Sequence, residues 1–341
     1  MELIKKEQKQ YKANLHCHSV LSDDKNTPEE LKELYKSHGY SILSITDHEV
    51  PWDHSDLSDP DFLLLTGYEC YIRTNPSAHY DVYAQEVHLN LFARDPHNET
   101  MICYNPNYLK YLLKFRPLEE IRRAGSERTR EYSVEYIQEY IDTAIANGYI
   151  VAYNHPYWSM ENSEQLLSYH GLFSMEMVNG GSFVSNRLEY NAALYDQLTR
   201  RGMRIAVHGG DDNHNRAPVG SVDCDSFRAF TYILSDDLSY DSVIHAMETG
   251  KMYCSTGPQI HSLSLEGRHL RVTCSPAEQV FLYTGSKTPS RLHGDRIERG
   301  ETVTEAEFDV HPRAQWFRVT VFDRGGHSAD TRAYFADELG W

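Results

Sequence analysis

Cysteine is scarce in this chain of 341 residues, since only six are present and no two form a C-x-x-C pair. Irregularly spaced cysteines argue against a disulfide framework. The sequence also lacks an apolar run long enough to span a membrane. Its first sixteen residues, MELIKKEQKQYKANLH, are charged and contain no apolar core of a secretory signal. We therefore expect reduced thiols in a cytoplasmic protein.

Positive charge is also in short supply. Lysine and arginine total 33 against 50 aspartates and glutamates, which gives a net charge of −17. This balance argues against binding to long nucleic acids or anionic membranes. A small anionic substrate remains compatible, because metal ions can reverse the sign of the field within one cleft. Histidine is plentiful, with eighteen residues.

Short apolar strands alternate with amphipathic helices through the first part of the chain. The predicted strands are residues 11–18, 40–48, 62–70, 86–93, 149–156, 173–179 and 203–212. Strands that alternate with helices predict a parallel sheet, and near-continuous apolar runs favour a closed β/α barrel. Such a barrel can use about 250 residues.

Helix signals lie between several of these strands. In residues 27–39, Thr27 is the predicted N-cap, Pro28 takes the first helical position and Glu30 completes a capping box. Further helices are predicted over residues 134–148, 191–202 and 240–250.

Two segments depart from this alternation. Residues 94–133 are rich in tyrosine and arginine and too long for an ordinary connection, so we expect an ordered lid with a helix in NPNYLKYLLKF. Residues 259–341 alternate with period two and predict a small antiparallel β domain. The predicted domains are therefore 1–258, with the lid as an insertion, and 259–341.

Residues of the types that bind metals recur at the ends of the predicted strands. Any one of them could be a core histidine or a surface acid, but their recurrence favours one shared site. Nine nitrogen and oxygen ligands suit two or three divalent ions. The candidates are His16, His18, Asp23, His48, Glu69, His88, His155, Asp212 and His214.

The ordered motifs H-x-H-(x4)-D, GYSILSITDH, GYE, VHLNLF, NHP and D-x-H resemble the PHP (polymerase and histidinol phosphatase) domain of metal-dependent hydrolases, over about residues 11–258. The resemblance implies a distorted seven-stranded β/α barrel and assigns the same nine ligands. The STGP segment and the β-rich tail resemble the CehA/McbA-type branch. Asp24 replaces that family's usual glycine, which leaves Asp23 and Asp24 as alternative ligands; register favours Asp23.

The nucleophile is expected to be a metal-bound hydroxide, because coordination can lower the pKa of water from about 15.7 to about 7. Cys17 should face away from the site. His155 or His214 could protonate a leaving oxygen, Asp47 could orient a ligating histidine, and Arg216 could bind an anionic group. Weaker candidates for a supporting role are Arg73, Arg122, Arg123, Glu176 and His208.

These residues favour a phosphoesterase that acts on a small phosphomonoester or phosphodiester. The alternatives are a carbamate, ester or amide hydrolase with the same metal cluster, and a metal-binding module without turnover. Imidazoles and carboxylates without thiolates point to Mn, Fe or Zn rather than Mg or Ca. The sequence does not indicate the oligomeric state.

Overall fold

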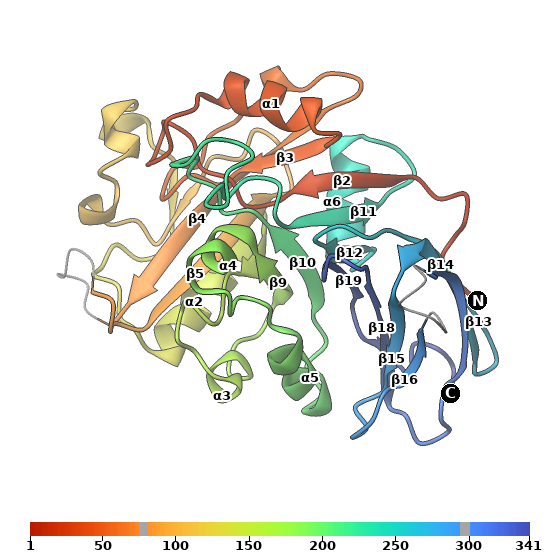
Figure 1. Ribbon diagram of the computed structural model, residues 1–341. Coiled ribbons are helices and arrows are strands. Elements are labelled where there is room, and N and C mark those ends of the chain that lie inside the picture. Colours follow the sequence, from red (N-terminus) through yellow and green to blue (C-terminus); the bar gives the residue numbers. More distant parts are fainter. Residues whose placement is uncertain (75–80, 294–300) are drawn as a thin grey trace.

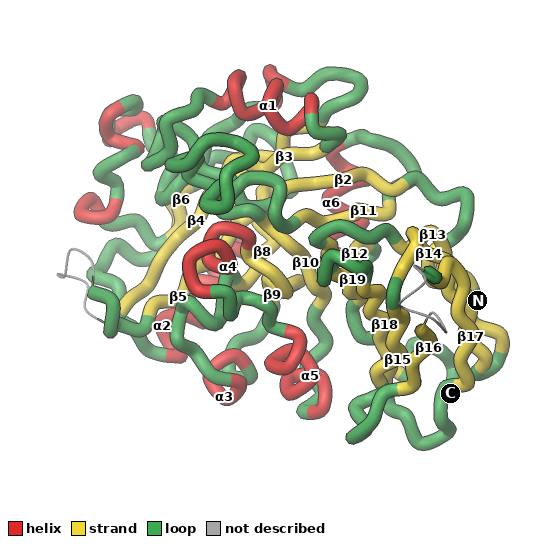
Figure 2. Tube along the Cα trace, viewed as in Figure 1, coloured by secondary structure: helices red, strands yellow, loops and turns green. Residues whose placement is uncertain are grey.

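The computed structural model describes residues 1–74, 81–293 and 301–341 (Figure 1). Its backbone forms a large mixed sheet with helices outside the strands, a small four-stranded antiparallel sheet and a two-stranded pair. Both chain ends lie beside the four-stranded sheet (Figure 1). Figure 2 shows that long loops connect many of the elements.

Seven strands of the large sheet match the seven predicted ones. They are β2 (Gln10–Asn14), β3 (Ile42–Ile45), β4 (Leu63–Arg73), β5 (Glu86–Ala93), β8 (Tyr149–Tyr153), β9 (Leu172–Asn179) and β10 (Ala206–Gly210). They lie side by side in this same order. The apolar runs that predicted them are buried, as expected for strands covered on both faces.

The predicted all-parallel arrangement is wrong at the centre of this series. β4 pairs antiparallel with β5, and β5 pairs antiparallel with β8, whereas the pairs on either side are parallel. A parallel neighbour would need a crossover connection, usually a helix. Instead the amide of Thr74 donates to the carbonyl of Gln85 at 3.0 Å, so β4 and β5 form a hairpin.

The first and last strands of the series meet through the loops that follow them. The amide of Asp212 donates to the carbonyl of His16 at 2.8 Å. The amide of His18 donates to the carbonyl of Asn213 at 3.3 Å. The ladders do not confirm the predicted distorted (β/α)7 barrel. β2 pairs on its other edge with β11 (Phe230–Leu234), so the sheet also continues beyond β2.

The large sheet extends from β11 into the C-terminal part of the chain. Its further strands are β12 (Met252–Ser255), β19 (Ser328–Thr331), β18 (Trp316–Phe322), β15 (Gln279–Tyr283), β16 (Ser290–His293) and β20 (Tyr334–Phe335). The separate four-stranded sheet contains β1 (Glu2–Ile4), β13 (Ile260–Glu266), β14 (His269–Ala277) and β17 (Val303–Asp309). The C-terminal part is therefore rich in antiparallel strands, as predicted. A domain boundary near residue 258 stays a prediction, because β12 and β19 pair across it.

The four predicted helices are present as α1 (Pro28–Ser37), α2 (Val134–Ala146), α5 (Ala192–Arg200) and α6 (Tyr240–Glu248). Thr27 and Glu30 form the predicted capping box, in which the Glu30 amide donates to Thr27 Oγ1 at 3.2 Å and the Thr27 amide donates to Glu30 Oε2 at 2.9 Å. Two short helices were not predicted: α3 (Ser163–Leu166) and α4 (Gly180–Asn186).

The helix predicted in NPNYLKYLLKF is wrong. This segment, residues 105–115, contains two 3₁₀ turns, η2 (Pro106–Tyr108) and η3 (Leu112–Lys114), and a third turn, η4 (Leu118–Glu120), follows it. The strands β6 (Met101–Ile102) and β7 (Arg123–Ala124) flank the three turns, and η1 (Ser55–Leu57) lies earlier in the chain. Pro117, two residues after this run, lacks an amide hydrogen and therefore prevents a regular helix from continuing through it. Buried Leu109 and Leu112 attach the segment to the main core.

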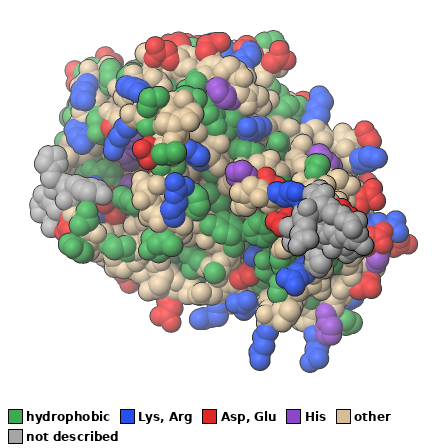
Figure 3. Space-filling model, in the orientation of Figure 1, with side chains coloured by type: hydrophobic (Ala, Val, Ile, Leu, Met, Phe, Trp, Pro, Cys, Tyr) green, Lys and Arg blue, Asp and Glu red, His purple; other side chains and the backbone are tan. Residues whose placement is uncertain are grey.

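The six cysteines are free and buried, which agrees with the predicted reduced thiols. Among the described residues, no helix has both the length and the apolar character needed to cross a membrane. Acidic and basic side chains are interspersed over the face shown in Figure 3.

Candidate metal centre

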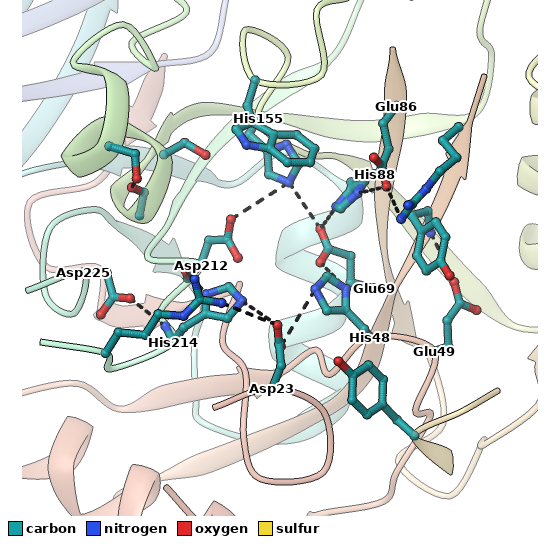
Figure 4. A pocket seen from close by; sticks show the side chains of 18 of the residues that line it. Asp23, His48, Glu49, Glu69, Glu86, His88, His155, Asp212, His214 and Asp225 are labelled. Atoms are coloured by element: carbon teal, nitrogen blue, oxygen red, sulfur yellow. Dashed lines mark hydrogen bonds and ion pairs between the residues drawn. The ribbon is translucent and has the colours of Figure 1, made fainter. Parts of the chain in front are cut away.

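A cavity of about 920 Å³ lies at the edge of the large sheet where β2, β3, β8 and β10 end. Loops that follow parallel strands meet at one edge of a sheet, which is where binding sites form in such folds. Histidine rings and carboxylates point toward one another there (Figure 4). The predicted ligands that line the cavity are Asp23, His48, Glu69, His88, His155, Asp212 and His214.

Glu69 of β4 lies at the centre of this arrangement. It is buried, and Asn154 Nδ2 donates to its Oε1 at 2.7 Å. Five imidazoles surround the same carboxylate. The distances are 3.2 Å to His16 Nε2, 3.5 Å to His18 Nε2, 3.0 Å to His48 Nδ1, 3.0 Å to His88 Nδ1 and 3.3 Å to His155 Nε2.

The H-x-H motif brings two imidazoles to the same side of the chain. Asp212 Oδ1 is 3.3 Å from His16 Nε2 and 3.0 Å from His18 Nε2. Cys17, between them, packs in a separate core cluster with Leu31 of α1. This is the arrangement expected for residues i and i+2 of an extended segment.

The structure brings Asp23, and not Asp24, into the cluster. Asp23 Oδ2 lies 3.4 Å from His214 Nε2, and Asp23 Oδ1 lies 3.9 Å from His48 Nε2. Asp24 Oδ2 instead accepts a hydrogen bond from Asn215 Nδ2 at 2.7 Å.

Three overlapping groups of ligand atoms could each hold a cation. They are His18, Asp23, His48 and His214; His16, His18, Glu69 and Asp212; and His48, Glu69 and His88. Within each group the atoms lie within 4.8 Å of one another. Three buried atoms in these groups have no hydrogen-bond partner among the residues that the structure describes: His16 Nε2, His48 Nδ1 and Glu69 Oε2. Because orphaned buried polar atoms are rare, divalent cations fit this site.

The pKa values also reflect a site built for positive charge. Burial opposes ionisation of Glu69, but the surrounding histidines, His16 foremost, hold its pKa well below the ordinary value. Burial and neighbouring imidazoles lower the pKa of His18 to about 4. For His88, burial is outweighed by Glu69 and Glu86, which raise its pKa to about 10. Protons and metal ions compete for such nitrogens.

Glu176 of β9 orients His16 from behind the cluster. Its Oε1 lies 2.8 Å from His16 Nδ1, which directs His16 Nε2 toward Glu69 and Asp212. Its Oε2 accepts the amide of His155 at 2.8 Å. A carboxylate behind a ligating histidine fixes its tautomer and ring orientation. His208 lies farther away, with its Nε2 3.8 Å from Glu176 Oε1.

Asp47 acts differently from the prediction that it orients a histidine. Within the described residues, its carboxylate accepts hydrogen bonds from the Ser19 amide at 2.7 Å and from the hydroxyls of Ser19 and Ser22. These bonds hold the turn that carries His18 and Asp23. The contact was unpredictable because Ser19 and Ser22 become neighbours of Asp47 only when β2 and β3 pair.

The sequence analysis missed Glu86, which touches a predicted ligand. Glu86 Oε1 lies 3.0 Å from His88 Nε2, and Arg73 Nη2 lies 2.8 Å from the same oxygen. The E-V-H spacing could have revealed it, because residues i and i+2 of a strand share a face.

A buried ion pair joins the 94–133 segment to the metal centre. Arg130 Nη1 donates to Glu49 Oε1 at 2.6 Å, and Arg130 Nη2 donates to Glu49 Oε2 at 2.7 Å. Glu49 follows His48, and its amide donates to the carbonyl of Glu69 at 2.8 Å. Nothing local in the sequence indicated this contact.

Cationic side chains lie at the mouth of the cavity. Arg216 is 77% exposed, and its Nη2 lies 3.8 Å from Asp23 Oδ2. Lys110, Tyr108 and Tyr111 place the 94–133 segment in the cavity wall. Arg122 and Arg123 are not among the lining residues, whereas Arg73 is.

No protein-family model and no curated protein sequence matches the chain. Solved structures are similar to it. A two-domain protein from Bacteroides vulgatus ATCC 8482, containing a predicted PHP-like metal-dependent phosphoesterase, is 15% identical with a TM-score of 0.46, and the match covers 97% of this chain and 96% of that one.

A protein from Bifidobacterium adolescentis ATCC 15703, assigned as a metal-dependent phosphoesterase, is 18% identical (TM-score 0.42; 72% of this chain, 98% of that one). An amidohydrolase from Chromobacterium violaceum with bound sulfate is 15% identical (TM-score 0.40; 59% and 87%).

Proposed function

We propose that this chain is a metal-dependent hydrolase of the PHP type that cleaves a small phosphate ester. The environment of Glu69 is the observation that carries the proposal. This buried carboxylate lies within 3.5 Å of five imidazole nitrogens, and its Oε2 has no hydrogen-bond donor within the described parts of the chain. Burial of so many ionisable groups is costly without strong partners. Divalent cations would supply those partners.

The chemistry of imidazole supports three cation sites. A neutral imidazole has one lone pair, so it can serve one ion at a time. His18 and His48 each belong to two groups and must be assigned to one. We assign His16, His18, Glu69 and Asp212 to the first site, Glu69, His88 and His155 to the second, and Asp23, His48 and His214 to the third. Glu69 serves two sites because it has two oxygens.

Bound ions of this kind lower the pKa of water to about 7 and polarise the oxygen of a substrate. Hydrolysis adds one water across the P–O bond and releases an alcohol, which must gain a proton. His155 and His214 face the cavity, so each can hold that proton when its Nε2 is not engaged as a ligand. Glu176 and Asp47 keep the ligand-bearing loops in position.

The charge at the mouth favours a phosphate ester over a carbonyl substrate. Arg216 and Lys110 line the cavity in a chain of net charge −17. A guanidinium binds the oxygens of phosphate in a bidentate manner. A carbamate, ester or amide offers less negative charge to these two residues.

Membership of the CehA/McbA-type branch stays a prediction, because it rests on the STGP segment and the β-rich tail alone.

Metal analysis and a hydrolysis panel test this proposal. Protein supplemented with Mn, Fe or Zn should carry two or three ions per chain and hydrolyse phosphate monoesters or diesters. His16→Ala with His18→Ala should remove most of the metal. His170→Ala is the matched control, because His170 is exposed outside the cavity.

Three results would contradict parts of the proposal. A supplemented wild-type protein without bound metal would refute the metal centre. Turnover of carbamates or carboxyl esters with inert phosphates would retain the hydrolase and refute the substrate class. Full metal content without turnover of any substrate in the panel would favour the metal-binding module.

A further inference from the structure

A second cavity of about 510 Å³ adjoins the metal cavity. Trp158 and Glu86 line both, so the two cavities meet at these side chains. We propose that the second cavity, named here the side pocket, binds an apolar or aromatic leaving group of the substrate. This inference rests on the proposed function and narrows its substrate class. The other described residues that line the side pocket are Asp81, Val82, Ala84, Tyr157, Met160, Glu161 and Asn186.

The side pocket differs from the metal cavity in charge. Among its described lining residues there is no lysine or arginine, whereas Lys110 and Arg216 line the metal cavity. The side pocket also presents apolar surface, since Tyr157 is 49% exposed and Met160 is 41% exposed. An ester with one anionic and one apolar end would therefore orient with its phosphate in the metal cavity.

The two buried carboxylates of the side pocket, Glu86 and Glu161, are engaged by other protein groups, and Asp81 Oδ1 accepts the amide of Tyr83 at 3.0 Å. Glu161 accepts hydrogen bonds from the hydroxyls of Tyr132, Tyr153 and Tyr169 at 2.7, 2.6 and 2.9 Å. Glu86 is paired with Arg73 and His88, as described above. Carboxylates paired in this way do not require a cationic ligand. The exposed apolar side chains of the side pocket therefore determine which group binds there.

The wall between the two cavities is held in place before any ligand binds. Buried Glu189 accepts the amides of Tyr157 and Trp158 at 3.0 and 2.9 Å. Met160 has a φ of 57°, a left-handed conformation that is uncommon for a residue other than glycine. Gln85 Nε2 donates to the carbonyl of Met160 at 3.0 Å. Strained residues of this kind persist where surrounding contacts hold them, often at ligand sites.

Trp158 also places the side pocket next to the reaction centre. Its ring centroid lies 5.0 Å from that of His88 and 4.9 Å from that of His155. A group that packs on Trp158 from the side pocket therefore lies close to His88 and His155, because both rings contact the same indole. This neighbourhood suits an aromatic alcohol joined through a single oxygen to a phosphate at the cluster.

Benzyl phosphate and methyl phosphate test the inference, because their leaving alcohols are similar in basicity and differ in apolar surface. The metal-loaded wild type should favour benzyl phosphate in kcat/KM by about ten-fold or more. Ala84→Phe, which fills the side pocket, should abolish the preference and leave kcat/KM for methyl phosphate unchanged. Met160→Ala should reduce the preference and also serves if Ala84→Phe fails to fold. Leu292→Ala, in distant β16, should leave it unchanged.

Equal kcat/KM values for the two esters in the wild type would overturn the inference, and so would a preference that survives both side-pocket variants. If no phosphate ester is hydrolysed, the proposed function fails and calorimetry decides the side pocket separately. Benzylphosphonate binding more tightly than methylphosphonate in the wild type, but not in the side-pocket variants, would support the side pocket. Equal affinities would refute it.

Discussion

Replacement of Arg130 by methionine would leave a carboxylate buried without its main partner. The side chains of Arg130 and Glu49 are 2% and 0% exposed, and two hydrogen bonds join them. Arg130 also donates to the carbonyl of Tyr71 at 2.6 Å. In the variant, Glu49 would retain the amide of Tyr71, which donates to its Oε1 at 3.2 Å.

The expected cost follows from the burial of this pair. Removal of one partner of a buried ion pair lowers the free energy of unfolding by about 3–5 kcal/mol, because the remaining charge is uncompensated. Glu49→Gln combined with Arg130→Met removes both charges and should recover at least about 1 kcal/mol. Loss of an exposed pair should cost far less, because solvent screens both charges. Arg204 and Asp337 form such a pair on the surface, with Nη2 and Oδ1 2.8 Å apart.

Urea unfolding of chelator-treated protein, followed by circular dichroism, measures these differences. Chelation removes the contribution of bound metal, which would otherwise add to stability. Arg130→Met should unfold at clearly lower urea than the wild type, whereas Arg204→Met should differ little. A loss for Arg130→Met no larger than that for Arg204→Met would refute the reasoning.

Three further outcomes are expected. Cys17→Ser should keep its bound metal and its kcat, because the thiol packs in the core beside Leu31; loss of kcat with metal content and folding intact would make the thiol catalytic. Glu176→Gln should weaken metal binding by about 10–100-fold, since the carboxylate orients His16; titration in metal buffers measures this, and unchanged affinity would exclude a positioning role. Arg216→Ala should lower kcat/KM for a phosphate ester by about ten-fold, the loss of one charge-assisted contact, and leave a carboxyl ester little affected; equal effects on both substrates would contradict the proposed contact.

The sequence by itself determined the seven strands, four of the helices and most residues of the cluster. Period and capping signals are local, so the Thr27–Glu30 capping box and the seven strands could be read from neighbouring residues. The same holds for His16 and His18, because the alternation of an extended chain sends i and i+2 to one side. Residues that follow β2, β3, β8 and β10 were brought together as expected at one edge of the sheet, whereas Glu69 lies within β4 and His88 within the antiparallel β5.

Tertiary structure decided the features that depend on contacts between distant parts of the chain, which local sequence patterns do not indicate. The direction of β5 depends on the hairpin after β4, and this replaced the predicted parallel order with a mixed sheet. The choice between the adjacent Asp23 and Asp24 depends on a turn that Asp47 holds from the next strand. Arg130 and Glu49 are 81 positions apart, and their contact exists only after the 94–133 segment packs on the core. The side pocket has the same origin, because its walls come from segments that meet only in the folded chain.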